Sequence, residues 1–137
     1  MREILFRGKD IAGKWYAGNL AVVKQDIHNG AGTIKAGSYI SNEYGLPFAY
    51  QIRPETVSQF TGLTDKNGQK IFEGDILKIT WSNKHCKEGV MKTSVVFWQG
   101  NFCHSGSMEP IWPHIVKNHY EVIGNIHDNP ELLKEQK

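Results

Sequence analysis

The sequence has little of several features that mark large protein classes. It holds only two cysteines in 137 residues, Cys86 and Cys103, which excludes a disulfide-dense scaffold. Two free thiols fit a reducing compartment, although a single bridge between them stays open. No apolar run approaches the roughly 18 residues of a membrane-spanning helix, and the run at residues 4–6 ends too early for a signal peptide. We therefore expect a soluble, cytoplasmic protein.

Charge of one sign is also scarce. Lysine and arginine exceed aspartate and glutamate by only 16 − 14 = 2, and residues 63–137 contain nine lysines and nine acidic residues. This balance lacks the basic excess by which many nucleic-acid-binding proteins are recognised. Charge alone therefore indicates no polyanionic partner.

The residues that are abundant favour β-strands. Valine, isoleucine, threonine and the aromatic residues number 42, against 16 for alanine, leucine and methionine, and 14 glycines interrupt them at short intervals. We predict an all-β or β-rich α+β fold. Residues 1–62 are expected to form an N-terminal β-sheet packed on a small C-terminal β-barrel of residues 63–137, as one compact unit with a short C-terminal helix at 130–135.

Turn residues separate the candidate strands. Asn67-Gly68 and Gly100-Asn101 are suited to tight turns, because these residues adopt positive φ at little cost. Residues 53–59 stay unassigned, since Pro54 suits a first helical turn whereas Thr56-Val57 favours a strand. In residues 75–81, apolar Leu77, Ile79 and Trp81 alternate with polar Lys78 and Thr80, which predicts a half-buried strand. The candidate strands are residues 3–7, 15–23, 38–40, 49–52, 60–64, 69–72, 75–81, 90–98, 101–105 and 120–126.

A set of short motifs follows in a fixed order along the chain. They are ILFR at 4–7, WYAG at 15–18, PETVSQFTGL at 54–63, DKNG at 65–68, IFEGDI at 71–76, EVIGNI at 121–126 and NPELL at 129–133. In this order they resemble the YopX family of phage and prophage proteins, most specifically from Thr61 to Ile76. The resemblance implies a small β-rich protein encoded by phage or prophage DNA. It assigns no catalytic residue, because the family has no established activity.

Acidic residues give the first candidate site. Asp65, Glu73 and Asp75 lie close in sequence, and paired carboxylates can act as acid and base or hold a hard cation. However, Asp65 opens an Asx-type turn, and Glu73 and Asp75 flank a glycine between two candidate strands. Turn chemistry explains all three.

A zinc site is a second candidate. His85-Cys86 and Cys103-His104, with His114 and His119, supply enough donors, but the Cys-x-x-Cys spacing of strong zinc motifs is missing. Adjacent strand residues also point to opposite faces. No nucleophile-elbow motif is present either. We therefore predict no metal, no cofactor and no enzymatic activity, and a metal-dependent hydrolase is the weakest of three functional hypotheses.

Two surfaces remain as candidates for binding. Ile111 and Trp112, in a loop between two prolines, form a candidate partner-binding site, although Trp112 can equally fold back over the core. The leading hypothesis is accordingly a phage or prophage accessory protein that binds an unknown host or phage protein, or associates with itself as a homo-oligomer. The alternative is a nucleic-acid-binding module that uses lysine and tryptophan side chains. Its candidate residues are Lys78, Trp81, Lys92 and Trp98.

Overall fold

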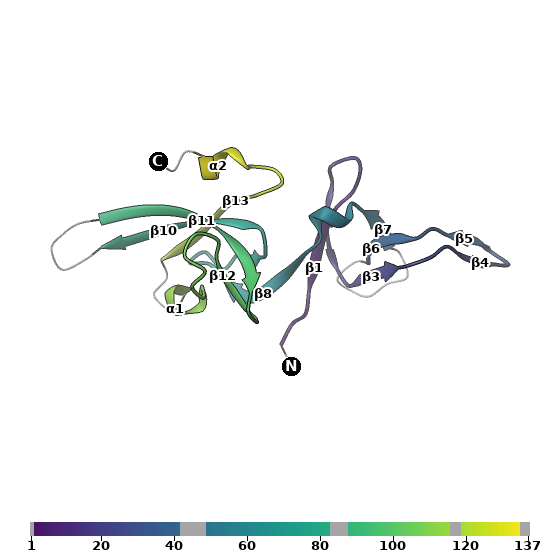
Figure 1. Ribbon diagram of the computed structural model, residues 1–137, viewed down its shortest axis with the longest axis horizontal. Helices are drawn as coiled ribbons and strands as arrows, with labels where there is room; N and C mark the ends of the chain where they lie inside the picture. The colour runs from purple at the N-terminus through teal and green to yellow at the C-terminus, as the bar shows by residue number, and fades with distance from the viewer. Residues whose placement is uncertain (1, 42–48, 83–87, 116–118, 135–137) are drawn as a thin grey trace. The chain divides into compact units, whose positions relative to one another are not determined.

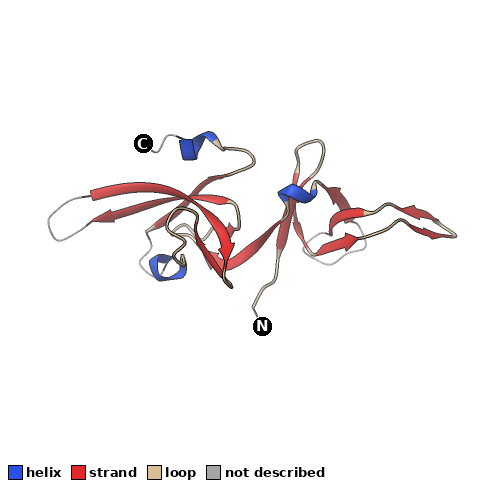
Figure 2. Cartoon of the chain, in the orientation of Figure 1, coloured by secondary structure: helices blue, strands red, loops and turns tan. Residues whose placement is uncertain are grey.

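The computed structural model describes residues 2–41, 49–82, 88–115 and 119–134. This part of the chain consists mainly of antiparallel strands, with three short helical segments between or after them (Figures 1 and 2). The predicted β-rich class is thereby confirmed. The chain divides into two compact units, Met1–Gln59 and Phe60–Lys137, here called the first and second units. The sequence placed this division after residue 62.

Antiparallel pairing organises the first unit. β2 pairs with β1, β3 with β6, β6 with β7, and β4 with β5. Both strands of the β4–β5 hairpin are exposed along their whole length. The elements are β1 (Phe6–Lys9), β2 (Trp15–Gly18), β3 (Leu20–Val23), β4 (Ile27–Asn29), β5 (Gly32–Ile34), β6 (Gly37–Ser41), β7 (Ala49–Ile52) and the 3-10 helix η1 (Pro54–Thr56).

Close backbone approach shapes the centre of the first unit. A Cβ atom at Gly8 of β1 would come within 2.1 Å of the Cδ1 atom of Ile52 in β7. The buried hydroxyl of Thr56 accepts a hydrogen bond from the Lys9 amide (2.8 Å) and donates one to the Arg53 carbonyl (2.6 Å). These bonds join η1 to β1. The unassigned segment 53–59 is therefore a helical turn followed by the start of a strand.

That strand, β8 (Ser58–Thr64), begins in the first unit and ends in the second. Ser58 and Gln59 pair with β1, whereas Phe60 and Thr64 pair with β9 (Lys70–Phe72). A second sheet has the strand order β12-β11-β10-β13. The remaining elements are β10 (Asp75–Ser82), β11 (Glu88–Trp98), β12 (Asn101–His104), α1 (Trp112–Ile115), β13 (Tyr120–Asn125) and α2 (Glu131–Lys134).

The second unit has one apolar core. Its members come from β9, β10, β11 and β13 and from the segment before α1: Ile71, Leu77, Ile79, Val95, Ile111 and Tyr120. Leu77 and Ile79 are buried while the intervening Lys78 is half-buried on the opposite side of β10, which confirms the alternation predicted for this strand. None of the described helices is long and apolar enough to cross a membrane.

The expected C-terminal barrel is instead an open four-stranded sheet in the part of the chain that the structure describes. The reason is that loops occupy the outer edges of both end strands. His104 and Phe102 of β12 bond to the backbone of Glu109 and Ile111, and Tyr120 of β13 accepts a hydrogen bond from the Lys66 amide (3.0 Å). A barrel would need these edges to pair with each other.

Both tight turns that the sequence predicts are present. Gly68, at φ +80°, donates its amide to the Asp65 carbonyl (3.0 Å) in the turn between β8 and β9. The turn between β11 and β12 is displaced by one residue from the predicted Gly100-Asn101, because Gln99 and Gly100, at φ +48° and +81°, form it while Asn101 pairs with Trp98 in β12. The short C-terminal helix is confirmed as α2.

Candidate functional site

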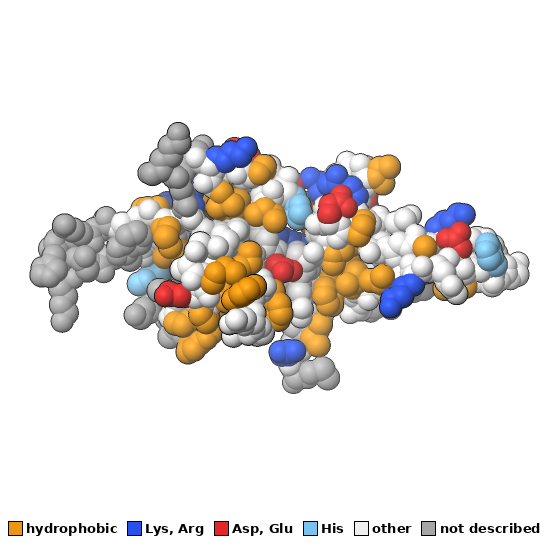
Figure 3. Space-filling view, viewed as in Figure 1, with side chains coloured by type: hydrophobic (Ala, Val, Ile, Leu, Met, Phe, Trp, Pro, Cys, Tyr) orange, Lys and Arg blue, Asp and Glu red, His pale blue; other side chains and the backbone are white. Residues whose placement is uncertain are grey.

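Large apolar side chains are exposed near the β11–β12 hairpin of the second unit. We call Phe97, Phe102 and Trp112 the aromatic patch, whereas Trp98 follows Phe97 on β11 and therefore points to the other face of the hairpin. Phe97, Trp98 and Trp112 are 55%, 48% and 57% exposed. Hydrophobic side chains gather over β12, the end of β11 and α1 (Figure 3). Exposed aromatic groups of this size are unusual on a surface that binds nothing.

The local fold explains why these rings are displayed. Phe97 and Phe102 are directly opposite across β11 and β12, and their rings meet edge to face with centroids 5.2 Å apart. Phe102 packs against the core, so it fixes one edge of Phe97 while the other ring surface stays in solvent. The aromatic patch therefore rests on a rigid hairpin.

The structure separates the two residues of the predicted partner-binding loop. Ile111 is 1% exposed and belongs to the core, where its amide bonds to the Phe102 carbonyl (3.1 Å). Trp112 follows it at the start of α1 and is 57% exposed. Ile111 thus covers the core, a role that the sequence left open for Trp112. Its burial leaves Trp112 at the surface.

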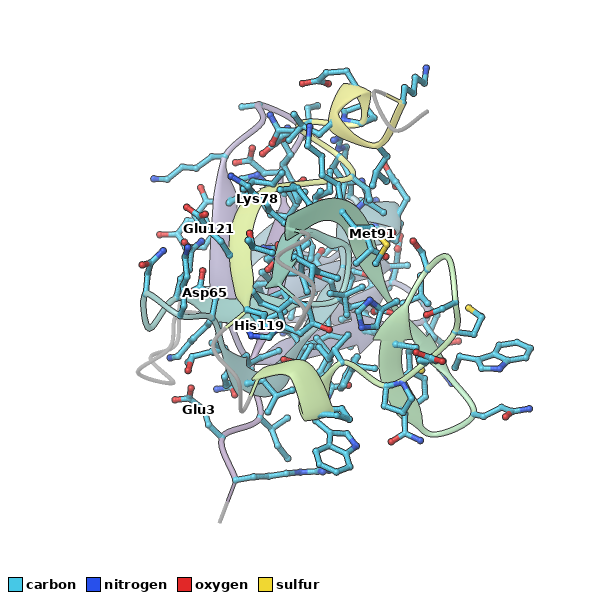
Figure 4. The ribbon with its side chains drawn as sticks, turned by 90° about the vertical axis from the view of Figure 1, so that its left-hand side faces the viewer. Glu3, Asp65, Lys78, Met91, His119 and Glu121 are labelled. Carbon is cyan, nitrogen blue, oxygen red and sulfur yellow. The ribbon has the colours of Figure 1, made fainter. Side chains whose placement is uncertain are left out.

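Of the four predicted nucleic-acid-binding residues, the structure brings two together. Lys78 and Lys92 are opposite each other on β10 and β11. On the other side of Lys78 the register partner is Glu121 of β13, whose carboxylate lies 3.7 Å from the Lys66 ammonium group. Figure 4 shows Lys78 and Glu121 near each other, beside β13. The row therefore joins a carboxylate to the two lysines instead of forming a purely basic stripe.

The two tryptophans do not complete that site. Trp98 lies six residues beyond Lys92 on the same strand, which is about 20 Å in an extended chain. Trp81 belongs to β10, but its side chain lies outside the described residues. The lysine pair is thus far from the exposed ring of Trp98.

The predicted histidine and cysteine donors are also separated. Cys103 Sγ lies 3.6 Å from the Asn101 carbonyl oxygen, whereas His104 Nε2 lies 2.5 Å from the Tyr120 hydroxyl on the other face of β12. Burial, with a smaller effect of the Glu109 charge, raises the pKa of Tyr120 above its usual 10.0, so its hydroxyl stays protonated. This pair is enclosed in the core.

No three metal-ligating side chains come together among the described residues. Cys86 and His85 lie outside them, as does the side chain of His114. Of the predicted donors, Cys103, His104 and His119 have described side chains, and these three do not form a shared centre.

The acidic residues take structural roles. Asp65 Oδ1 accepts hydrogen bonds from the amides of Asn67 (2.8 Å) and Gln69 (2.9 Å), and Oδ2 accepts one from the Val122 amide (2.9 Å). Asp75 Oδ2 accepts a hydrogen bond from the Phe72 amide (2.7 Å). The turn interpretation is confirmed for both residues, and Asp65 additionally fastens its turn to β13.

Sequence reasoning missed a cluster of cations and rings in the first unit. The guanidinium of Arg7 lies 5.1 Å and the ammonium of Lys9 5.7 Å from the Trp15 ring centroid. Nearby, the Lys14 ammonium lies 5.3 Å from the ring of Tyr16. The signal was available, because basic and aromatic residues alternate through residues 6–16, but it becomes specific only when β1 and β2 pair.

Comparisons with known proteins agree with this fold. The sequence model described as "YopX protein" matches residues 6–134. The solved structure of protein EF1440 from Enterococcus faecalis is similar, with a TM-score of 0.58 and 25% sequence identity over 97% of this chain and 99% of that chain. Among curated proteins, none matches. Because the match to the family spans nearly the whole chain, this protein belongs to the YopX family.

Proposed function

We propose that this protein is a non-enzymatic accessory protein of a phage or prophage that works in the cytoplasm by self-association through the aromatic patch. The observation that supports the proposal is the exposure of Phe97 and Trp112, each more than half in solvent, on one unit. Aromatic residues dominate the energetically important positions of protein interfaces. Burying these rings against a partner removes apolar surface from water.

A second copy of the chain is the partner that the charges favour. Residues 60–137 contain nine lysines and nine acidic residues, so two second units approach each other without net repulsion. A two-fold axis also uses each favourable contact twice, and such dimers are the commonest oligomers. The edges of the second sheet are occupied by loops, so side chains, not strand pairing, supply the contact.

Light scattering coupled to size exclusion tests this proposal. The expected mass exceeds 15.5 kDa, rises with protein concentration and persists at high salt, because apolar contacts are not screened as ion pairs are. Trp112→Ala should weaken the dimer by about 30-fold, the effect of losing a central interface residue.

Val90→Ala is the matched control. Val90 is 58% exposed and apolar, and it lies on the same strand as Phe97 but outside the aromatic patch. Its replacement should leave the dissociation constant unchanged. A monomer at every concentration contradicts the proposal, as does a dimer that both Trp112→Ala and Phe97→Ala leave intact.

A further inference from the structure

The hairpin of β1 and β2 in the first unit places cations beside aromatic rings on both of its faces. Lys9 is opposite Trp15 in the register, and Arg7 precedes Lys9 by two residues on the same face. Both cations contact the Trp15 ring, at 5.7 Å and 5.1 Å. We call β1, β2 and the turn between them the basic hairpin.

The other face of the basic hairpin carries a stack of rings. Tyr16 stacks on Tyr50 of β7 with centroids 4.1 Å apart and planes 14° from parallel. The Lys14 ammonium lies 5.3 Å from the Tyr16 ring, and Tyr50 is 44% exposed. The stacked pair therefore places the Lys14 ammonium group near the Tyr16 ring and leaves the Tyr50 ring accessible to solvent.

The net positive charge of the chain lies in the same unit. Residues 1–59 hold seven lysines and arginines and five acidic residues, an excess of 7 − 5 = 2, whereas residues 60–137 hold nine of each. Two of these acids have partners within the unit. Asp10 accepts a hydrogen bond from the Lys14 amide (2.8 Å), and Glu55 lies 3.6 Å from Arg53. The ammonium group of Lys14 itself is exposed.

We infer that the basic hairpin binds single-stranded nucleic acid, with phosphates near Lys9 and Lys14 and bases stacked at Trp15 on one face and at Tyr50 on the other. A ligand that satisfies both kinds of group must be anionic and must offer flat rings. Single strands do so, because each phosphate is followed by a base with accessible faces. A duplex hides those faces and is too stiff to bend around a turn of this size. This site is independent of the aromatic patch.

Cations and aromatic rings lie close together on the basic hairpin but not on the second sheet. On the second sheet, Lys78 lies between Lys92 and Glu121 in the register. The exposed Trp98 lies far from these lysines along β11. On the basic hairpin the cations directly contact the rings. The two locations therefore predict opposite results for the same set of variants.

Fluorescence anisotropy of a short labelled oligo(dT), titrated with the full chain at low salt and then at rising salt, tests the inference. Tyr50→Ala should weaken binding by about 5- to 150-fold, the range for the loss of one stacked base. Lys14→Ala should weaken it and reduce the slope of log affinity against log salt by about 0.7, as expected for one lost phosphate contact on a single strand.

Two controls separate this site from general charge attraction. Lys35→Ala removes another exposed lysine of the first unit, one that pairs with Asp26 at 3.3 Å, and should have little effect on affinity. The double variant Lys78→Ala, Lys92→Ala should also retain affinity. Thermal unfolding of each variant checks that the fold is kept, and Lys14, which is exposed, remains informative if Tyr50→Ala unfolds.

Four outcomes overturn the inference. They are the absence of binding at low salt, equal displacement by duplex DNA, equal displacement by poly-glutamate, and loss of affinity in the Lys78, Lys92 variant with none in the Lys14 and Tyr50 variants. Displacement by poly-glutamate would show that the cations act without the rings and would point to an acidic protein segment instead.

Discussion

The two units reach stability in different ways. In the second unit, bulky apolar side chains from four strands meet in one core, and six of them are at most 4% exposed. In the described part of the first unit the buried apolar side chains are Leu5, Ile40 and Ile52, accompanied by buried Ser38, Thr56 and Ser58, while Ile11, Val22, Ile27, Ile34 and Tyr50 are exposed. The first unit therefore depends more on backbone pairing and on the hydrogen bonds of Thr56.

The two units also differ in how their candidate binding surfaces arise. The second unit has a well-filled core and nevertheless leaves the rings of Phe97 and Trp112 exposed, which makes these rings interface candidates. The first unit leaves rings at its surface, where lysine and arginine side chains cover part of them. We expect substitutions of buried side chains in the well-filled core of the second unit to lower the free energy of unfolding strongly. In the first unit, with its smaller core, we expect such losses mainly where atoms are in close contact.

The largest effect should come from the core of the second unit. Leu77→Ala, at a side chain with 0% exposure, should lower the free energy of unfolding by about 2–5 kcal/mol, because it leaves a cavity among well-packed neighbours. Hydrogen exchange should show the loss of protection in residues 60–137.

Val90→Ala is the control for that measurement, since it removes similar atoms from a side chain that is 58% exposed on the paired strand. It should change stability by less than about 0.5 kcal/mol. If both variants cost the same, or if Leu77→Ala removes protection from residues 1–59 alone, the described contrast between the units is wrong.

A smaller but sharper effect is expected at Gly8 in the first unit. An added methyl group would meet Ile52 Cδ1 at 2.1 Å and its Cβ and Cγ1 atoms at 3.1 Å. Gly8→Ala should therefore destabilise by about 1–3 kcal/mol, as overpacking does. Urea unfolding, with hydrogen exchange over residues 1–59, measures the effect.

Gly30→Ala in the same unit is the matched change, because nothing lies within 4 Å of the added atom. It should be nearly neutral. Adding Ile52→Val to Gly8→Ala removes the terminal methyl that clashes, so the double variant should be more stable than the sum of the single changes predicts. Strict additivity would mean that the contact does not limit stability.

Local sequence signals predicted much of the fold. The turns at Gly68 and Gly100, the alternation along β10 and the terminal helix all depend on residues within a few positions of one another. The structural roles of Asp65 and Asp75 were also predictable, because Asx turns are local. The hydrogen bond from the Val122 amide to Asp65 was not predictable, because the two residues are 57 positions apart.

The parts that failed depend on long-range pairing. The barrel was expected because many short strands suggest closure, but the return of residues 109–111 along β12 occupies one of the edges that closure needs. Ile111 and Trp112 are similar as apolar residues in sequence, and only the hydrogen bond from Ile111 to Phe102 decides which of them is buried. The basic hairpin likewise becomes visible only when β1 and β2 pair in register.

The smallest predicted effect concerns turns, where the two units should be alike. Gly13 in the first unit and Gly68 in the second have φ of +92° and +80°, a region that β-branched residues avoid. Gly13→Val and Gly68→Val should each destabilise by about 1 kcal/mol, the strain of a left-handed residue with a side chain. Gly30→Val and Gly106→Val, at open sites without positive φ, are the controls for urea unfolding of each unit. Because turn strain is local, it should not depend on how full the neighbouring core is. A cost at Gly68 several times that at Gly13 would show instead that the turn and the core of the second unit are coupled, which the hydrogen bonds of Asp65 to both the turn and β13 make possible.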